Sequence, residues 1–140
     1  MYRKIVVAYD GSENSKRALR AGVELARLSG AELTSISVRE SLPYFAATVG
    51  EVEEAQEEIE RFFHRITKEA KDVAGLAGVE LETEVRPGHE VETIVTYAKE
   101  GGFDLLVVGF AGHSNIFGRF MGSTAANLSR LAPCSVLIVK

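Results

Sequence analysis

Residues 105–112 read LLVVGFAG, and nine further residues separate this segment from Gly122 and Ser123. The apolar run at 105–108 is typical of a buried strand, and the segment from Thr124 to Leu128 has helical character. Strand, glycine loop and helix start therefore follow one another. Such an arrangement presents free backbone N–H groups and the positive end of a helix dipole to an anion. The sequence thus predicts an anion site at this loop, with a nucleotide phosphate as the expected anion.

Outward from this segment, apolar runs alternate with helix-period segments along the chain. The predicted strands are 5–9, 33–38, 79–85, 104–108 and 135–139, and strict alternation at 79–85 favours a strand near an edge. Helices are predicted between 12 and 30, along the apolar stripe 52–73, over 91–98 and between 124 and 133. We expect Gly75 and Gly78 to end the second of these, and the segment 41–50 to be a loop. Strands that alternate with helices predict an α/β fold, a parallel sheet with helices on both faces.

The predicted topology places candidate ligand groups at one edge of the sheet. Ligands of such sheets bind beyond the carboxyl ends of the strands, where the strand order reverses. Asp10 follows the first strand, Val38 ends the second, and the glycine loop follows the fourth, so these groups converge if strands one and four are neighbours. Asp10 has an alternative role in an Asx turn that caps the first helix. Because its carboxylate would repel a triphosphate, sugar hydroxyls or a bound metal are its expected partners.

Composition limits the class of protein and its partners. A chain of 140 residues is expected to form one domain over 1–140. The net charge of −4 argues against nucleic acid as a partner, because phosphate backbones require a basic face. No apolar run approaches the ~20 residues that span a bilayer, and Met1–Lys4 lacks the layout of a signal peptide, so we expect a cytoplasmic protein without membrane partners. The single cysteine, Cys134, reads as a small core residue, and the histidines show no metal-ligand spacing.

Three segments together resemble the universal stress protein family. Residues 7–15, VAYDGSENS, look like the opening of a member, and residues 132–139, APCSVLIV, are similar to its closing strand. The spacing of Gly109, Gly112, Gly122 and Ser123 fills the ATP-binding signature of that family without a gap. The resemblance extends over the whole chain, and it indicates the ATP-binding subgroup.

This resemblance implies a fold, a ligand and a partner. The fold is an open, twisted, five-stranded parallel sheet of order 3-2-1-4-5, which is Rossmann-like, and the ligand is ATP, with or without Mg²⁺. The family also implies a homodimer in which the closing strand pairs with its copy through Val136, Leu137, Ile138 and Val139. The implied nucleotide contacts comprise the ribose side (Ala8, Tyr9, Asp10), the adenine (Val38, through its backbone) and the ribose and phosphates (Gly109, Gly112, Gly122, Ser123, Thr124). His113 belongs to the predicted nucleotide-binding set, with simple exposure as its alternative, and Arg119 is open between a phosphate contact and simple exposure.

Three functions remain open at this stage. The first is a regulatory stress-response module that binds ATP and hydrolyses it slowly or not at all. The second is a slow ATPase or autophosphorylating enzyme, for which only partial candidates exist (Asp10, Ser123, Arg119), so no catalytic residue is assigned. The chain contains no G-x-x-x-x-G-K-[ST] loop. The third is a nucleotide-free interaction protein that keeps the same fold.

Overall fold

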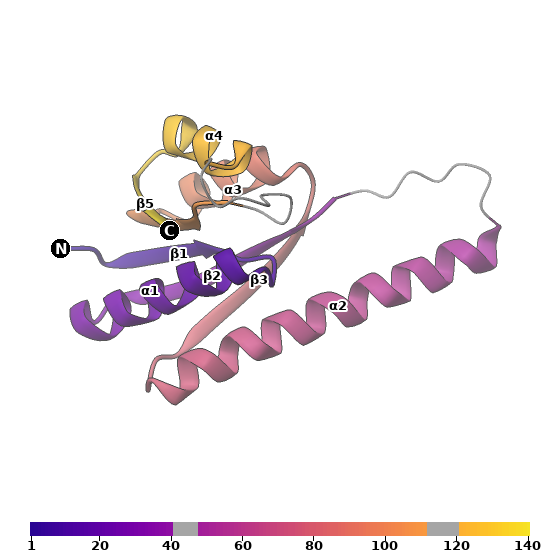
Figure 1. The fold of residues 1–140 in the computed structure, drawn as a ribbon, viewed down its shortest axis with the longest axis horizontal. Coiled ribbons are helices and arrows are strands. Elements are labelled where there is room, and N and C mark those ends of the chain that lie inside the picture. Colours follow the sequence, from indigo (N-terminus) through magenta and orange to yellow (C-terminus); the bar gives the residue numbers. More distant parts are fainter. Residues whose placement is uncertain (41–47, 112–120) are drawn as a thin grey trace.

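The computed structural model describes residues 1–40, 48–111 and 121–140. Strands and helices alternate along these residues (Figure 1). Their bounds are β1 Lys4–Ala8, α1 Glu13–Ser29, β2 Glu32–Arg39, α2 Val49–Leu76, β3 Leu81–Pro87, α3 Glu90–Glu100, β4 Leu105–Gly109, α4 Ser123–Leu131 and β5 Ser135–Val139. The strands form one parallel sheet of order β3-β2-β1-β4-β5, which confirms the predicted fold class and strand order.

The centre of the sheet is the pair β1 and β4. Ile5 lies opposite Leu105 and Val7 opposite Val107, so both strands end at the same edge. Alternate residues of β1 enter different clusters: Ile5 and Val7 contact one core, and Val6 contacts the other. Burial on both faces explains why these strands read as continuous apolar runs. The candidate ligand groups are expected to converge if the first and fourth strands are neighbours. Because β1 and β4 are neighbours, this condition is met.

The helices cover the two faces in pairs, α1 and α2 on one and α3 and α4 on the other (Figure 1). Small residues bring α1 close to the sheet: a Cβ added to Gly22 would lie 2.6 Å from Cγ2 of Val7. Cys134 is half-buried and packs against the α3–α4 cluster, so it lies at the margin of the core, and burial raises the pKa of its thiol.

Several predicted boundaries are wrong by a few residues. Helix α2 begins at Val49, before the expected end of the loop at Gly50, because Thr48 and Glu51 form a reciprocal capping box; residues 41–47 lie outside the described part. Gly75 lies inside α2, which ends at Leu76, and Gly78 follows the C-cap residue Ala77 with a left-handed φ of +73°. Strand β3 therefore starts at Leu81, two residues later than expected, at the predicted sheet edge.

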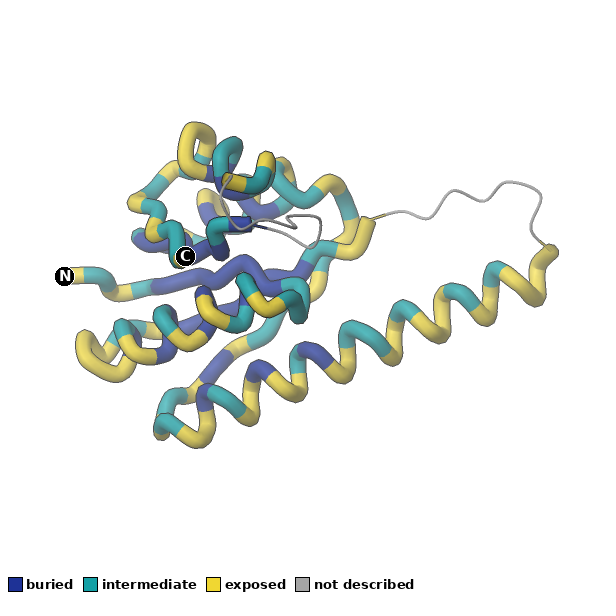
Figure 2. The backbone as a smooth tube through the Cα atoms, in the orientation of Figure 1, coloured by how far each residue is buried: buried dark blue, intermediate teal, exposed yellow. Residues whose placement is uncertain are grey.

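Helix α2 is longer than the sheet that it covers. Its buried residues, Ile66, Ala70 and Ala74, all belong to the C-terminal half. The N-terminal half projects past the sheet, and its residues are exposed or half-buried (Figure 2). Across residues 1–40, 48–111 and 121–140, none of the helices combines the length and the apolar character needed to traverse a bilayer.

Candidate functional site

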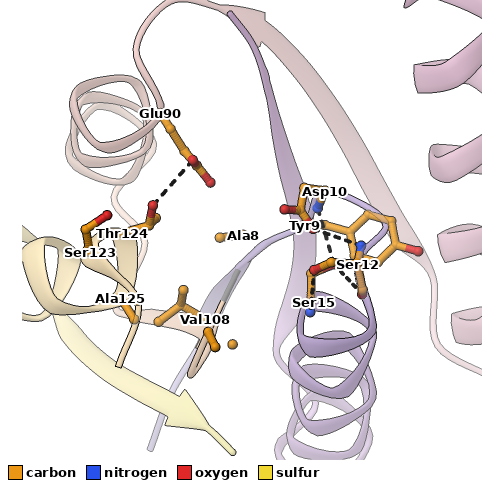
Figure 3. Close-up of a pocket in the computed structure, with 13 residues that line it drawn as sticks. Ala8, Tyr9, Asp10, Ser12, Ser15, Glu90, Val108, Ser123, Thr124 and Ala125 are labelled. Atoms are coloured by element: carbon orange, nitrogen blue, oxygen red, sulfur yellow. Dashed lines mark hydrogen bonds between the residues drawn. The ribbon is translucent and has the colours of Figure 1, made fainter. Parts of the chain in front are cut away.

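A cavity of about 290 Å³ lies at the carboxyl ends of β1 and β4 (Figure 3). Residues from the β1–α1 junction, the start of α3, the end of β4 and the start of α4 line it. The cavity is therefore at the point where the strand order reverses, the usual ligand position in an open α/β sheet. Its lining includes every described residue of the predicted set except Val38, namely Ala8, Tyr9, Asp10, Gly109, Gly122, Ser123 and Thr124.

The β1–α1 side of the cavity is a hydrogen-bonded turn. Oδ1 of Asp10 accepts the Ser12 N–H at 2.9 Å, so the Asx turn exists. Oγ of Ser12 accepts the Ser15 N–H at 3.2 Å and caps α1. The buried Ser15 hydroxyl donates to the Ser12 carbonyl at 2.9 Å and accepts the Asp10 N–H at 3.3 Å. These bonds fix the backbone that carries the Asp10 carboxylate beside the cavity, and the ligand role of Asp10 stays a prediction.

The opposite side is the N-terminus of α4. Gly122 is the N-cap residue, and Ser123 and Thr124 open the helix without a side-chain cap. The Gly122 N–H donates to the Phe110 carbonyl at 2.9 Å, and the Phe110 N–H donates to the Val139 carbonyl at 2.8 Å. The helix start is thereby tied to the ends of β4 and β5. The first N–H groups of an α-helix have no intrahelical acceptor, which makes this end suitable for an anion.

A second cavity of about 240 Å³ adjoins the first and contains Val38. Tyr9, Asp10 and Glu90 line both cavities, so they mark the junction. The second cavity is mostly apolar, because Ile36, Val38, Phe62, Phe63 and Ile94 line it. The Phe62 and Phe63 rings meet edge-on, with centroids 5.1 Å apart. Val38 is thus separate from the predicted phosphate residues and close to the predicted ribose residues.

Glu90 and the Phe62–Phe63 pair are site residues that the sequence analysis missed. Glu90 is the first residue of α3, and its Oε2 accepts a hydrogen bond from Oγ1 of Thr124 at 3.4 Å (Figure 3). The available signal was position, because Glu90 follows the Pro87-Gly88 turn at the carboxyl end of β3. In the sequence, the phenylalanines belong to the apolar stripe of α2. No local pattern distinguishes a stripe residue that lines a cavity from one that only packs against the sheet.

The described lining of both cavities is acidic. Its charged residues are Asp10, Glu40 and Glu90, and the described positions around the cavities include no Lys, Arg or His. Burial raises the pKa of the Tyr9 hydroxyl, and the nearby carboxylates of Glu69 and Asp10 raise it further, so the phenol is neutral at physiological pH. Within the three described ranges, no group of three His, Cys, Asp or Glu side chains is placed to hold a metal ion.

Gly109 has a packing role in this structure. A Cβ at this position would lie 2.7 Å from the backbone oxygen of Asn14 in α1. The missing side chain thus permits the close approach of β4 to α1, independently of any approach to a ligand. The predicted contacts Gly112 and His113 and the undecided Arg119 lie outside the described residues.

Comparison with known proteins gives a consistent match. The model of the universal stress protein family matches residues 1–140. Universal stress protein YxiE of Bacillus subtilis is 36% identical over 148 residues, with 100% of both chains covered. The structure of universal stress protein UspA from Lactobacillus plantarum has a TM-score of 0.88 at 25% identity and covers 99% of this chain and 98% of its own. A universal stress protein solved in complex with cAMP has a TM-score of 0.75 at 31% identity, with 99% and 97% covered.

Proposed function

Because the chain belongs to the universal stress protein family, we propose that it is a regulatory protein that binds an adenine nucleotide, with ATP as the first candidate. One observation carries the proposal. The predicted contacts that the structure describes, apart from Val38, line a single cavity at the switch point between β1 and β4. Val38 lines the cavity next to it. The cAMP complex of a relative of 31% identity supports an adenine nucleotide as the ligand class.

The two cavities suit the parts of a nucleotide. The uncapped N-terminus of α4 at Gly122–Thr124 favours a phosphate. The apolar cavity around Val38 and Phe62 favours the flat, apolar faces of a base. Asp10 lies at the junction, where we expect its carboxylate to accept hydrogen bonds from ribose hydroxyls. We propose this order, base to phosphate, as the pose.

A regulatory role follows from the elements that the ligand would join. The β1–α1 turn, α2, α3 and α4 all contribute to the lining, so an occupied site holds these elements together. We propose that hydrolysis is slow or absent, since the candidate groups that the described part of the cavity lining offers are Ser123 and the carboxylates of Asp10 and Glu90. If Mg²⁺ accompanies ATP, it would be held by the phosphates, by water and by one or two of these carboxylates.

The first test is the nucleotide content of freshly purified protein, released by acid and separated by anion-exchange chromatography. We expect near-stoichiometric adenine nucleotide, with ATP intact if hydrolysis is slow. Mostly ADP would instead favour the ATPase. Absence of nucleotide, followed by no calorimetric binding of AMP, cAMP or ATP with Mg²⁺, would contradict the proposal and favour the interaction protein.

A matched pair of variants locates the phosphate end. Ser123→Ala removes a hydroxyl from the start of α4, and we expect it to weaken AMP binding by roughly tenfold, since a hydrogen bond to a charged group contributes about 1.5–3 kcal/mol. Ser129→Ala is the control, because it removes the same group from the exposed end of the same helix. Equal affinities of the two variants would place the phosphate elsewhere.

A further inference from the structure

We propose that Ser37 is a positioning residue for the nucleotide site, because its hydroxyl holds the peptide unit that leads into Asp10. This inference rests on the proposed function and names a residue on which ribose recognition at that same site depends. Ser37 lies in β2 and is 1% exposed. It is not among the described residues that line either cavity, so its effect on binding must pass through another residue.

The Ser37 hydroxyl acts at the point where β1 ends. The paired register of β1 and β2 ends at Ala8 and Ile36, and the Tyr9 N–H that follows donates to the Ile36 carbonyl at 3.0 Å. The Tyr9 carbonyl accepts a hydrogen bond from a side chain, the Ser37 hydroxyl, at 2.7 Å. This bond is buried, so the removal of the hydroxyl would take a hydrogen-bond donor away from a buried carbonyl, which is unfavourable.

A second buried serine holds the other polar group of the same peptide unit. The Tyr9 carbonyl and the Asp10 N–H belong to one planar amide. The Asp10 N–H donates to the Ser15 hydroxyl at 3.3 Å, and that hydroxyl donates to the Ser12 carbonyl at 2.9 Å (Figure 3). Ser37 of β2 and Ser15 of α1 therefore hold one amide plane through its carbonyl and its N–H, and rotation of the plane would break both hydrogen bonds.

The orientation of this amide plane affects the direction of the Asp10 side chain. Rotation of the plane changes ψ of Tyr9 and φ of Asp10, and it thereby redirects the Cα–Cβ bond of Asp10. Asp10 lines both cavities and is the predicted ribose contact. Ser37 thus preorganises the ribose end of the site, so that binding does not have to order it. The proposed base and phosphate contacts belong to other elements, such as α2 and α4, and do not depend on this amide.

Ser35 provides a matched control for Ser37. It lies two residues earlier in β2, on the same face of the strand, and it is 0% exposed. Within the described part of the chain, its Oγ has no hydrogen-bond partner. Ser35→Ala therefore removes the same atom from the same face of the same strand without breaking a hydrogen bond, and we expect it to bind nucleotides as the unmodified protein does.

Calorimetric titration of nucleotide-free protein tests this inference. The ligands are AMP and dideoxy-AMP, which has the same base and phosphate but lacks both ribose hydroxyls. We expect the unmodified protein to prefer AMP, and we expect Ser37→Ala to weaken AMP binding roughly five- to tenfold while dideoxy-AMP binding changes by less than about twofold. Ser37→Thr keeps the hydroxyl and suits a strand, so it should restore AMP affinity to within about twofold of the unmodified protein.

Equal AMP affinities of Ser37→Ala and Ser35→Ala would overturn the inference. An equal loss of affinity for AMP and dideoxy-AMP would also overturn it, because Ser37 would then have a structural role only. If Ser37→Ala does not fold, Ser37→Cys repeats the comparison with a side chain of similar shape and a weak donor. An unmodified protein that binds both ligands equally would overturn the inference and leave the proposed function intact, whereas one that binds neither ligand would contradict the proposed function itself.

Discussion

At the scale of single residues, glycines in this chain meet different physical demands. A Cβ at Gly109 would lie within 2.7–2.9 Å of atoms of Asn14, backbone atoms included, so the position is closed to any side chain. Gly11 combines a φ of +83° with a Cβ position 2.9 Å from Cγ2 of Ile66. Gly75, in contrast, has nothing within 4 Å and a helical backbone. Gly109, which belongs to the glycine pattern associated with ligand binding, is thus also needed for the close approach of α1 to the sheet.

The first prediction compares two of these glycines. Gly109→Ala should lower the free energy of unfolding by about 1–3 kcal/mol, because the added methyl group must displace the α1 backbone. Gly75→Ala is the control and should raise it by up to about 1 kcal/mol, since alanine stabilises an exposed helix position. Urea unfolding followed by circular dichroism measures both. If Gly109→Ala leaves the free energy of unfolding unchanged, α1 moves without a loss of stability, and the glycine is needed for ligand binding and not for packing.

At the scale of secondary-structure elements, α2 combines two environments. Its C-terminal half packs on the sheet through Ile66, Ala70 and Ala74, and its N-terminal half projects beyond it (Figures 1 and 2). The capping box at Thr48 and Glu51 stabilises the projecting end, which has few tertiary contacts of its own. Phe62 lies at the transition, packed against the core and lining the apolar cavity. A ligand in the apolar cavity would therefore contact α2 directly, and its binding would act on the position of the helix.

The second prediction concerns this aromatic side chain. Phe62→Ala should weaken AMP binding about tenfold or more, because contact between a base and an aromatic ring contributes about 1–3 kcal/mol. Binding of ribose 5-phosphate, which has no base, should stay the same. Val52→Ala, in the projecting half of α2, is the control and should leave both affinities unchanged. If Phe62→Ala weakens both ligands equally, the ring supports the fold and does not contact the base.

At the scale of the whole molecule, the two edges of the sheet differ in character. Edge strand β3 carries charged residues, and Arg86 pairs with Glu84 at 3.1 Å. Edge strand β5 is apolar, and Leu137 is 36% exposed. An exposed apolar edge is a template for pairing with another strand. We propose that β5 pairs with its copy to form a homodimer.

The third prediction tests this interface. The unmodified protein should sediment as a dimer, and Leu137→Lys should raise the dimer dissociation constant at least about tenfold, because a lysine charge opposes edge pairing. Leu28→Lys is the control: Leu28 is 68% exposed near the C-terminal end of α1 and is not part of β5, so its replacement should leave the dimer intact. Sedimentation velocity at several concentrations distinguishes the states. A monomeric unmodified protein would contradict the proposal.

The sequence by itself determined the kind of fold and most of the elements. Apolar runs, helical periods and stops such as Gly30 and Pro133 are local signals, so the alternation of strands and helices was predictable within a few residues. Because ligands bind at the carboxyl ends of parallel strands, Asp10 and the start of α4 were predictable as candidate ligand contacts. The strand order came from the family resemblance, because periodicity does not encode which strands are neighbours.

Only the tertiary structure decided which other groups reach the site. Glu90 and Phe62 lie far apart in the sequence, and they reach the cavities because α3 and α2 cover opposite faces of the sheet beside the same strand ends. The close contact between Gly109 and Asn14 likewise depends on how α1 packs on β4. Such contacts join segments through the three-dimensional path of the chain, and no local pattern of residues records them.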